Sequence, residues 1–135
     1  MKSPSEIVSQ MLKNDAFSRW LNIEVLETDL GNCSLKLKIN KEMLNGFLIA
    51  HGGISYSLAD SSLAFASNSY GYKAVSIETS ISHLKKVLEN DTLTAVCSEI
   101  NRGKTIGKYE SKIYNQENEL VAHFLGTVFI SKEIW

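Results

Sequence analysis

The feature that most constrains the fold is a long internal segment without lysine or arginine. Between Glu42 and Lys73, thirty residues contain a single acidic side chain, that of Asp60. Residues 51–70 lack proline, contain few β-branched side chains and lead to Gly71, which is suited to end a helix. They therefore predict one helix of about five turns. A helix that is apolar or small on every side is expected inside a domain.

Alternation with period two dominates the sequence on both sides of this helix. Leu35, Leu37 and Ile39 alternate with polar residues, as in a half-buried antiparallel strand, within a predicted hairpin at residues 23–39. Further strand-like segments lie at residues 73–82, 92–100, 106–114 and 120–130. In the first of them, one face is expected to carry Val75, Ile77, Thr79 and Ile81. We expect an α+β fold in which a curved sheet of five to six antiparallel strands wraps the central helix.

The N-terminal residues predict a helical segment, residues 1–20, packed on a domain formed by residues 21–135. Ser3 and Glu6 have the spacing of a capping box at the start of a helix. Apolar side chains then recur at helical spacing, at Ile7, Val8, Met11 and Leu12. A second short helical turn, beginning near Asn14–Asp15, is expected to present Phe17, Trp20 and Leu21 for packing.

Charge and composition narrow the classes of function and partner. The net charge is −1, without the basic stripe of a nucleic-acid-binding protein. No apolar run is long enough to span a membrane, and the N-terminus lacks a secretory signal, so a cytoplasmic location is expected. Cys33 and Cys97 stand outside any CxxC motif and are expected to be buried free thiols. His83 and His123 have no partners at metal-ligand spacing, so no metal site is expected.

Asp60 is an anomaly within the uncharged helix, because burying a carboxylate costs free energy. Gly53, Ser57, Asp60 and Ala64 form one stripe along the helix, and their small side chains leave room for a ligand. The helix begins at His-Gly-Gly, where free N–H groups favour an oxyanion. A carboxylate two turns beyond such a start suits acyl transfer to water, as a general base or as a nucleophile. Asn45 is a candidate to orient the water or contact the substrate.

Three motifs in register resemble the hotdog-fold thioesterases of the phenylacetic-acid-degradation type. They are Asn-Gly at residues 45–46, Ala-His-Gly-Gly at residues 50–53 and Ser-Leu-Ala-Asp at residues 57–60. The resemblance spans about residues 14–130 and implies a hydrolase acting on acyl-CoA thioesters, with an aryl-acyl or medium-chain acyl group. Coenzyme A would then be part of the substrate, and no separate cofactor is implied.

The resemblance also implies roles for individual residues. Asp60 corresponds to the nucleophile or general base, Gly52 to the oxyanion N–H donor, and Asn45 and His51 to residues at the thioester. Ser76 corresponds to a position near the attacking water. The family forms homodimers in which Asp60 of one subunit would meet Asn45 and Gly52 of the other, and pairs of dimers form tetramers. Candidates for contacts to the substrate and to the CoA phosphates are Gly53, Lys85, Lys86, Arg102, Gly103 and Lys104.

Each of these assignments has a simpler alternative. Asp60 can be a structural carboxylate, His51 a helix cap, Asn45 a turn former beside Gly46, and Ser76 an ordinary strand residue. The basic residues can be solvated surface. Two other functions are compatible with a hotdog fold: an acyl-thioester dehydratase or hydratase, and a non-catalytic acyl-CoA-binding protein.

Overall fold

Three α-helices and six β-strands form the computed structural model, which describes residues 1–135. The helices are α1 (Pro4–Asn14), α2 (Ala16–Trp20) and α3 (Gly52–Asn68), with a short 3-10 helix at Lys41–Met43. The strands are β1 (Glu24–Asp29), β2 (Asn32–Lys38), β3 (Tyr72–His83), β4 (Thr92–Arg102), β5 (Ile106–Tyr114) and β6 (Leu120–Ile134).

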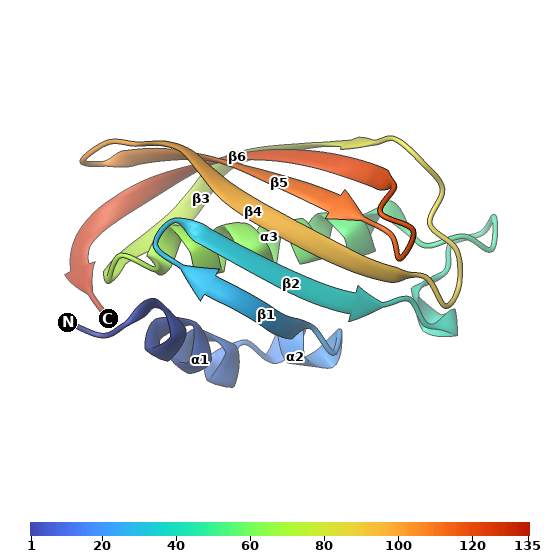
Figure 1. Cartoon of the computed structure of the whole chain (residues 1–135), viewed down its shortest axis with the longest axis horizontal. Helices are drawn as coiled ribbons and strands as arrows, with labels where there is room; N and C mark the ends of the chain where they lie inside the picture. The colour runs from blue at the N-terminus through green and yellow to red at the C-terminus, as the bar shows by residue number, and fades with distance from the viewer.

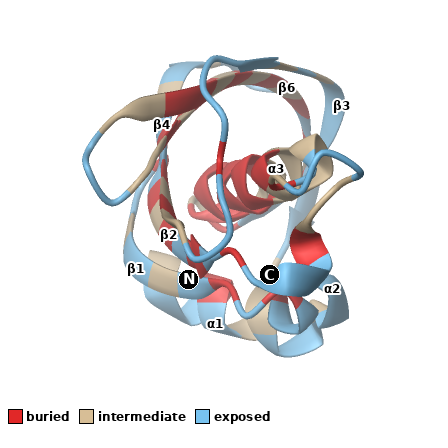
Figure 2. Cartoon of the chain, turned by 90° about the vertical axis from the view of Figure 1, so that its right-hand side faces the viewer, coloured by how far each residue is buried: buried red, intermediate tan, exposed pale blue.

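One antiparallel sheet in the order β1-β2-β4-β5-β6-β3 curves around α3 (Figure 1). The end-on view shows α3 enclosed by the sheet, with α1 and α2 across the opening between the edge strands β1 and β3 (Figure 2). The predicted α+β arrangement, with a central helix wrapped by a six-stranded sheet, is thereby confirmed. The helix is slightly shorter than predicted, because His51 is its N-cap and Ser69 its C-cap. Gly71 follows at a φ of +95°, which suits its predicted role in ending the helix.

The core explains how an uncharged helix can be surrounded by a sheet. Leu58, Leu63 and Phe65 are almost completely buried among strand side chains. Gly126 on β6 allows the close approach of α3, since a Cβ atom there would lie 2.6 Å from Leu63 Cδ2. The buried Ser62 hydroxyl bonds to the Ala59 carbonyl and to the Ser111 hydroxyl. The buried hydroxyl of Ser62 therefore has the hydrogen-bond partners that burial requires.

The predicted faces of β3 are wrong, because the strand contains a β-bulge. The pairing with β6 shifts between Ser76 and Glu78, which leaves Ile77 as an extra residue. Val75 and Ile77 are 63% and 58% exposed, whereas Thr79 and Ile81, beyond the bulge, are half-buried on the core side. The inserted residue reverses the alternation, so the positions that would face the core before the bulge face solvent after it.

In the N-terminal region, the predicted capping box is confirmed, whereas the expected packing of two aromatic side chains is wrong. The Ser3 hydroxyl accepts from the Glu6 N–H, and the Glu6 carboxylate accepts from the Ser3 N–H, so the capping box is present. The helix α1 packs against α3 and β1. In α2, however, Phe17 is 51% and Trp20 is 72% exposed. The expected burial of these two rings does not occur, because α2 turns both away from the core; the helix buries Ser18 instead, and the expected burial of Leu21, directly after the helix, is observed.

Three further properties concern cysteines, metals and membranes. Cys33 and Cys97 are buried free thiols that lie opposite each other on β2 and β4. No group of three or more histidine, cysteine, aspartate or glutamate side chains is arranged to hold a metal ion. None of the helices has the length and apolar character needed to cross a membrane.

Candidate active site

The Asp60 stripe is the open side of α3. Gly53, Ser57, Asp60 and Ala64 are each partly exposed, whereas most other residues of the helix are buried. The Asp60 carboxylate has no hydrogen bond and no ion pair within the chain. Burial raises the pKa of Asp60, and the neighbouring Asp15 carboxylate raises it further.

Asp15 was not singled out by the sequence, although it belongs to the surroundings of Asp60. It caps α2 by accepting from the Ser18 N–H at 2.9 Å, and its other oxygen accepts from the Ser18 hydroxyl at 2.6 Å. That hydroxyl lies 2.8 Å from the hydroxyl of Ser61, next to Asp60 in the chain. An N-cap pattern could have located Asp15, but only the packing of α2 on α3 brings it near Asp60.

Asp60 and Ser76 line the same pocket, which has a volume of about 430 Å³. Ser76 comes from β3, directly before the bulge. Its hydroxyl, like the Asp60 carboxylate, has no hydrogen-bond partner in the chain. The structure therefore brings these two predicted site residues together, with free polar groups on both.

The start of α3 leaves one backbone donor free. His51 is the N-cap residue, and its Nδ1 accepts the Gly53 N–H at 2.9 Å. The Gly52 N–H has no acceptor in the chain. Gly52 therefore offers an unpaired N–H at the positive end of the helix dipole, whereas the Gly53 N–H is used by the cap.

A second pocket, also about 430 Å³ in volume, contains Gly52 together with Asn45, Lys85 and Lys86. The Asn45 Oδ1 accepts from the N–H groups of Phe47 and Ile49, which makes Asn45 the turn former of this loop. Its Nδ2 has no partner in the chain and remains available to a ligand. Asn45 thus organises the loop and retains a free donor beside Gly52.

His83 is a pocket residue that the sequence interpretation missed. It lines the pocket with Gly52, and a Cβ atom at Gly52 would lie 3.1 Å from the His83 Nε2. In the sequence, His83 has no partner at metal-ligand spacing, which gave it no expected role. Strand alternation would have placed His83 on the same face as Thr79 and Ile81, once the bulge was known.

The two groups of residues do not form one site within a single chain. Gly52 and Asp60 are eight residues apart on a straight helix, which places them about 12 Å apart along its axis. They also line different pockets. One chain therefore carries a half-site with backbone and amide donors and another half-site with a carboxylate and a hydroxyl.

The four basic residues predicted to bind CoA also divide into two groups. Lys85 and Lys86 lie near Gly52, with Lys85 paired to Glu119. Arg102 instead donates to the Ser67 carbonyl and the Tyr109 hydroxyl at the far end of α3, about 22 Å along the helix from Gly52. Gly103 and Lys104 follow it there, with Lys104 exposed. A single chain does not gather all four around one phosphate group.

Residues 47–122 match the family model of the thioesterase superfamily. The acyl-coenzyme A thioesterase PaaI of Escherichia coli is 38% identical over 116 residues, which cover 86% of this chain and 83% of that protein. A putative esterase of Archaeoglobus fulgidus is 39% identical over 119 residues, or 88% of this chain and 77% of the relative. The chain belongs to the thioesterase superfamily. It is a thioester hydrolase, as the sequence motifs predicted.

Two solved structures superpose on this thioesterase over nearly the whole chain. The E. coli PaaI protein, from the phenylacetic acid degradation operon, superposes with a TM-score of 0.95 at 34% identity, covering 97% of this chain and 95% of that chain. A hypothetical thioesterase from Streptococcus pneumoniae, solved with coenzyme A, has a TM-score of 0.87 at 27% identity, covering 93% and 98%. The predicted hotdog fold of the phenylacetic-acid-degradation type is confirmed.

Proposed function

We propose that this thioesterase hydrolyses aryl-acyl or medium-chain acyl-CoA, with Asp60 as its general base or nucleophile. The observation that carries the proposal is the partly buried Asp60 carboxylate without a partner. A structural aspartate in such a place would be expected to accept hydrogen bonds that offset its burial. Coenzyme A takes part only as a portion of the substrate. Relatives named as an acyl-CoA thioesterase, or solved with coenzyme A, support this substrate class.

The half-site at Gly52 supplies what the carbonyl oxygen of a thioester needs. The Gly52 N–H and the Asn45 Nδ2 would donate to that oxygen, and both bonds strengthen as it becomes negative in the tetrahedral intermediate. His51 acts as a positioning residue, because it accepts the Gly53 N–H and leaves the Gly52 N–H free. Lys85 and Lys86 would attract the CoA phosphates at the rim of this pocket.

The half-site at Asp60 supplies the attack on the carbonyl carbon. In the general-base route, Asp60 takes a proton from water held by the Ser76 hydroxyl, and the water oxygen forms the new C–O bond. The C–S bond then breaks, its electron pair leaves with the CoA sulfur, and the proton on Asp60 passes to that sulfur, which restores the carboxylate. In the nucleophilic route, Asp60 itself displaces the thiolate, and water hydrolyses the resulting anhydride. Both routes give a carboxylic acid and free CoA.

The two half-sites would meet across a homodimer, with Asp60 and Ser76 of one subunit opposite Asn45 and Gly52 of the other. The unpaired side of edge strand β3, with exposed Val75 and Ile77 side chains, is a surface suited to this contact. Two-fold symmetry would then form two identical sites. In a dimer of dimers, Arg102, Gly103 and Lys104 could reach CoA bound to another subunit, which they cannot do within one chain.

Mixing two inactive variants tests the shared site. Asp60→Asn loses the carboxylate and Gly52→Pro loses the N–H, so each homodimer should fail to release CoA thiol. Subunits co-expressed in equal amounts should regain about a quarter of wild-type activity, because half of the dimers contain both chains and each of these has one intact site. Asp60→Asn mixed with Asp60→Ala is the matched control and should stay inactive. Heterodimers seen by native mass spectrometry without recovered activity would refute a site built from two subunits.

Asp15→Asn should shift the acid side of the activity profile to lower pH. The asparagine still caps α2 but removes the negative charge that raises the pKa of Asp60. A lower pKa leaves Asp60 ionised, and therefore active as base or nucleophile, at more acidic pH. The measurement is kcat/KM for one acyl-CoA across pH. Asp29→Asn at the end of β1 is the charge-matched control and should leave the pH profile unchanged. An unchanged profile in Asp15→Asn would mean that Asp60 takes no part in the reaction.

A further inference from the structure

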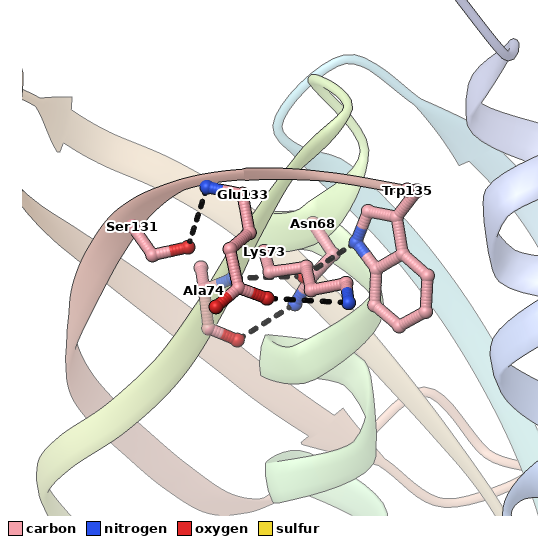
Figure 3. Close-up of polar contacts among 6 residues, drawn as sticks. All are labelled: Asn68, Lys73, Ala74, Ser131, Glu133 and Trp135. Atoms are coloured by element: carbon pink, nitrogen blue, oxygen red, sulfur yellow. Dashed lines mark hydrogen bonds and ion pairs between the residues drawn. The ribbon is translucent and has the colours of Figure 1, made fainter.

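The pocket beside Asp60 has a reactive end and an apolar end. Seven of its twelve lining residues are hydrophobic, among them Leu63, Val128 and Trp135. Near Asp60 the pocket contains the free carboxylate and the free Ser76 hydroxyl. The opposite end lies at the last turn of α3, where the chain of β6 crosses to Trp135 (Figure 3).

The polar groups at the far end are already paired with one another. The Asn68 Nδ2 donates to the carbonyls of Ala64 and Ala74, and its Oδ1 accepts from the Ala74 N–H and the Trp135 Nε1 (Figure 3). The Lys73 ammonium pairs with Glu133 at 3.3 Å and lies 5.5 Å from the centre of the Trp135 ring. This end therefore offers a ligand apolar surface and little free hydrogen-bonding capacity. An acyl group has the same polarity, with one reactive polar end and an apolar remainder.

Trp135 is fixed in this position by three contacts. Its Nε1 donates to Asn68 at 2.8 Å, its backbone N–H donates to the Gly71 carbonyl at 3.1 Å, and Lys73 lies near its ring. The distance along α3 from Asp60 to Asn68 is about 12 Å. An extended chain advances about 1.2 Å per bond, so roughly ten bonds span this distance.

We infer that this pocket holds the acyl group, that its preferred occupant is a straight acyl chain of about eight to ten carbons, and that Trp135 is the residue that limits chain length. The inference rests on the proposed function and narrows its substrate class. A phenylacetyl group is too short to extend from Asp60 to Trp135.

Opposite changes in the length of the pocket test this inference. With straight-chain acyl-CoAs, the wild-type kcat/KM should rise about fourfold per added methylene until the chain meets Trp135, and then stop rising. Trp135→Ala should move the maximum to longer chains by two carbons or more. Ala64→Leu, one turn beyond Asp60 on the pocket wall, should move it to shorter chains. Trp135→Phe keeps an aromatic wall without the bond to Asn68 and should keep the wild-type maximum.

Either of two results would overturn the inference without contradicting the thioesterase function. One is that kcat/KM peaks at the same chain length in the wild type, Trp135→Ala and Ala64→Leu. The other is faster hydrolysis of phenylacetyl-CoA than of decanoyl-CoA.

If the wild type released no thiol from any acyl-CoA, the proposed function would fail, and a binding measurement would still test the pocket. In Trp20→Phe, Trp135 is the one remaining tryptophan. Decanoyl-CoA should then change its fluorescence and acetyl-CoA should not; no change with decanoyl-CoA would reject the pocket assignment.

Discussion

Asp60→Asn is expected to abolish thiol release while making the folded protein more stable at neutral pH. Loss of the base or nucleophile should lower kcat by about 10²- to 10⁴-fold across a panel of acyl- and aryl-CoAs. Burial raises the pKa of Asp60, so the folded state resists ionisation. The wild type therefore loses stability as pH rises from the ordinary aspartate range through that raised pKa. Asparagine carries no charge and avoids this loss.

Thermal unfolding at several pH values measures the expected gain in stability of Asp60→Asn. The variant should unfold at a higher temperature than the wild type at neutral pH, and the difference should vanish at acidic pH, where Asp60 is protonated in both states. A structural carboxylate would give a destabilised variant instead. Asp29→Asn serves as the control and should change neither activity nor its pH dependence.

Assays with the same panel of acyl- and aryl-CoAs distinguish thioester hydrolysis from the two alternative functions, hydration and binding without turnover. If the wild type hydrates enoyl-CoA without releasing thiol, the protein is a hydratase. If it binds acyl-CoA without turnover, the protein is a binding protein. Asp60→Asn with unchanged hydrolysis of every substrate would remove Asp60 from the mechanism.

Gly52→Pro is expected to cost about 10²- to 10³-fold in kcat with the helix intact, as for loss of one oxyanion donor. Gly52 is the first residue of α3, where proline is tolerated. The preceding His51, at φ −61° and ψ 136°, already has the extended conformation that proline requires. The substitution therefore removes the free N–H and little else from the backbone.

Gly52→Ala is the matched control, because it adds a Cβ atom but keeps the N–H. That atom would lie 3.1 Å from the His83 Nε2, so the ring must shift slightly in both variants. Comparison of kcat/KM, with circular dichroism as the check on folding, isolates the donor. Equal losses in the two variants would assign the effect to crowding at His83, and an active proline variant would show that another group stabilises the oxyanion.

The parts of the fold that the sequence predicted are those governed by local periodicity. The uncharged segment around Asp60 formed α3, and alternation located β5 at Ile106–Tyr114. The stripe from Gly53 to Ala64 followed from helical geometry alone and is the open side of the helix. The hotdog fold and the enzyme class also agree with the motifs. Each of these depends on neighbours within a few turns or on residues in fixed register.

The parts that the sequence did not predict depend on packing between distant segments. The bulge at Ile77 arises from the pairing of β3 with β6, and no residue type at that position requires it. Asp15 meets Asp60 only because α2 packs on α3, and His83 meets Gly52 only because β3 ends beside the start of α3. The contact of the Arg102 guanidinium with the Ser67 carbonyl likewise joins two segments that lie far apart in the chain. Periodicity carries no information about such contacts.

The bulge in β3 also bears on how the protein behaves when it is concentrated. A long, flat edge strand with exposed apolar side chains, such as Val75 and Ile77, is a template for open-ended sheet growth. The extra residue interrupts the ladder and increases the local twist, so an approaching strand finds only short runs of matching N–H and C=O groups. The edge is thereby restrained from recruiting copy after copy into filaments, while its apolar surface stays available for contact with a single partner.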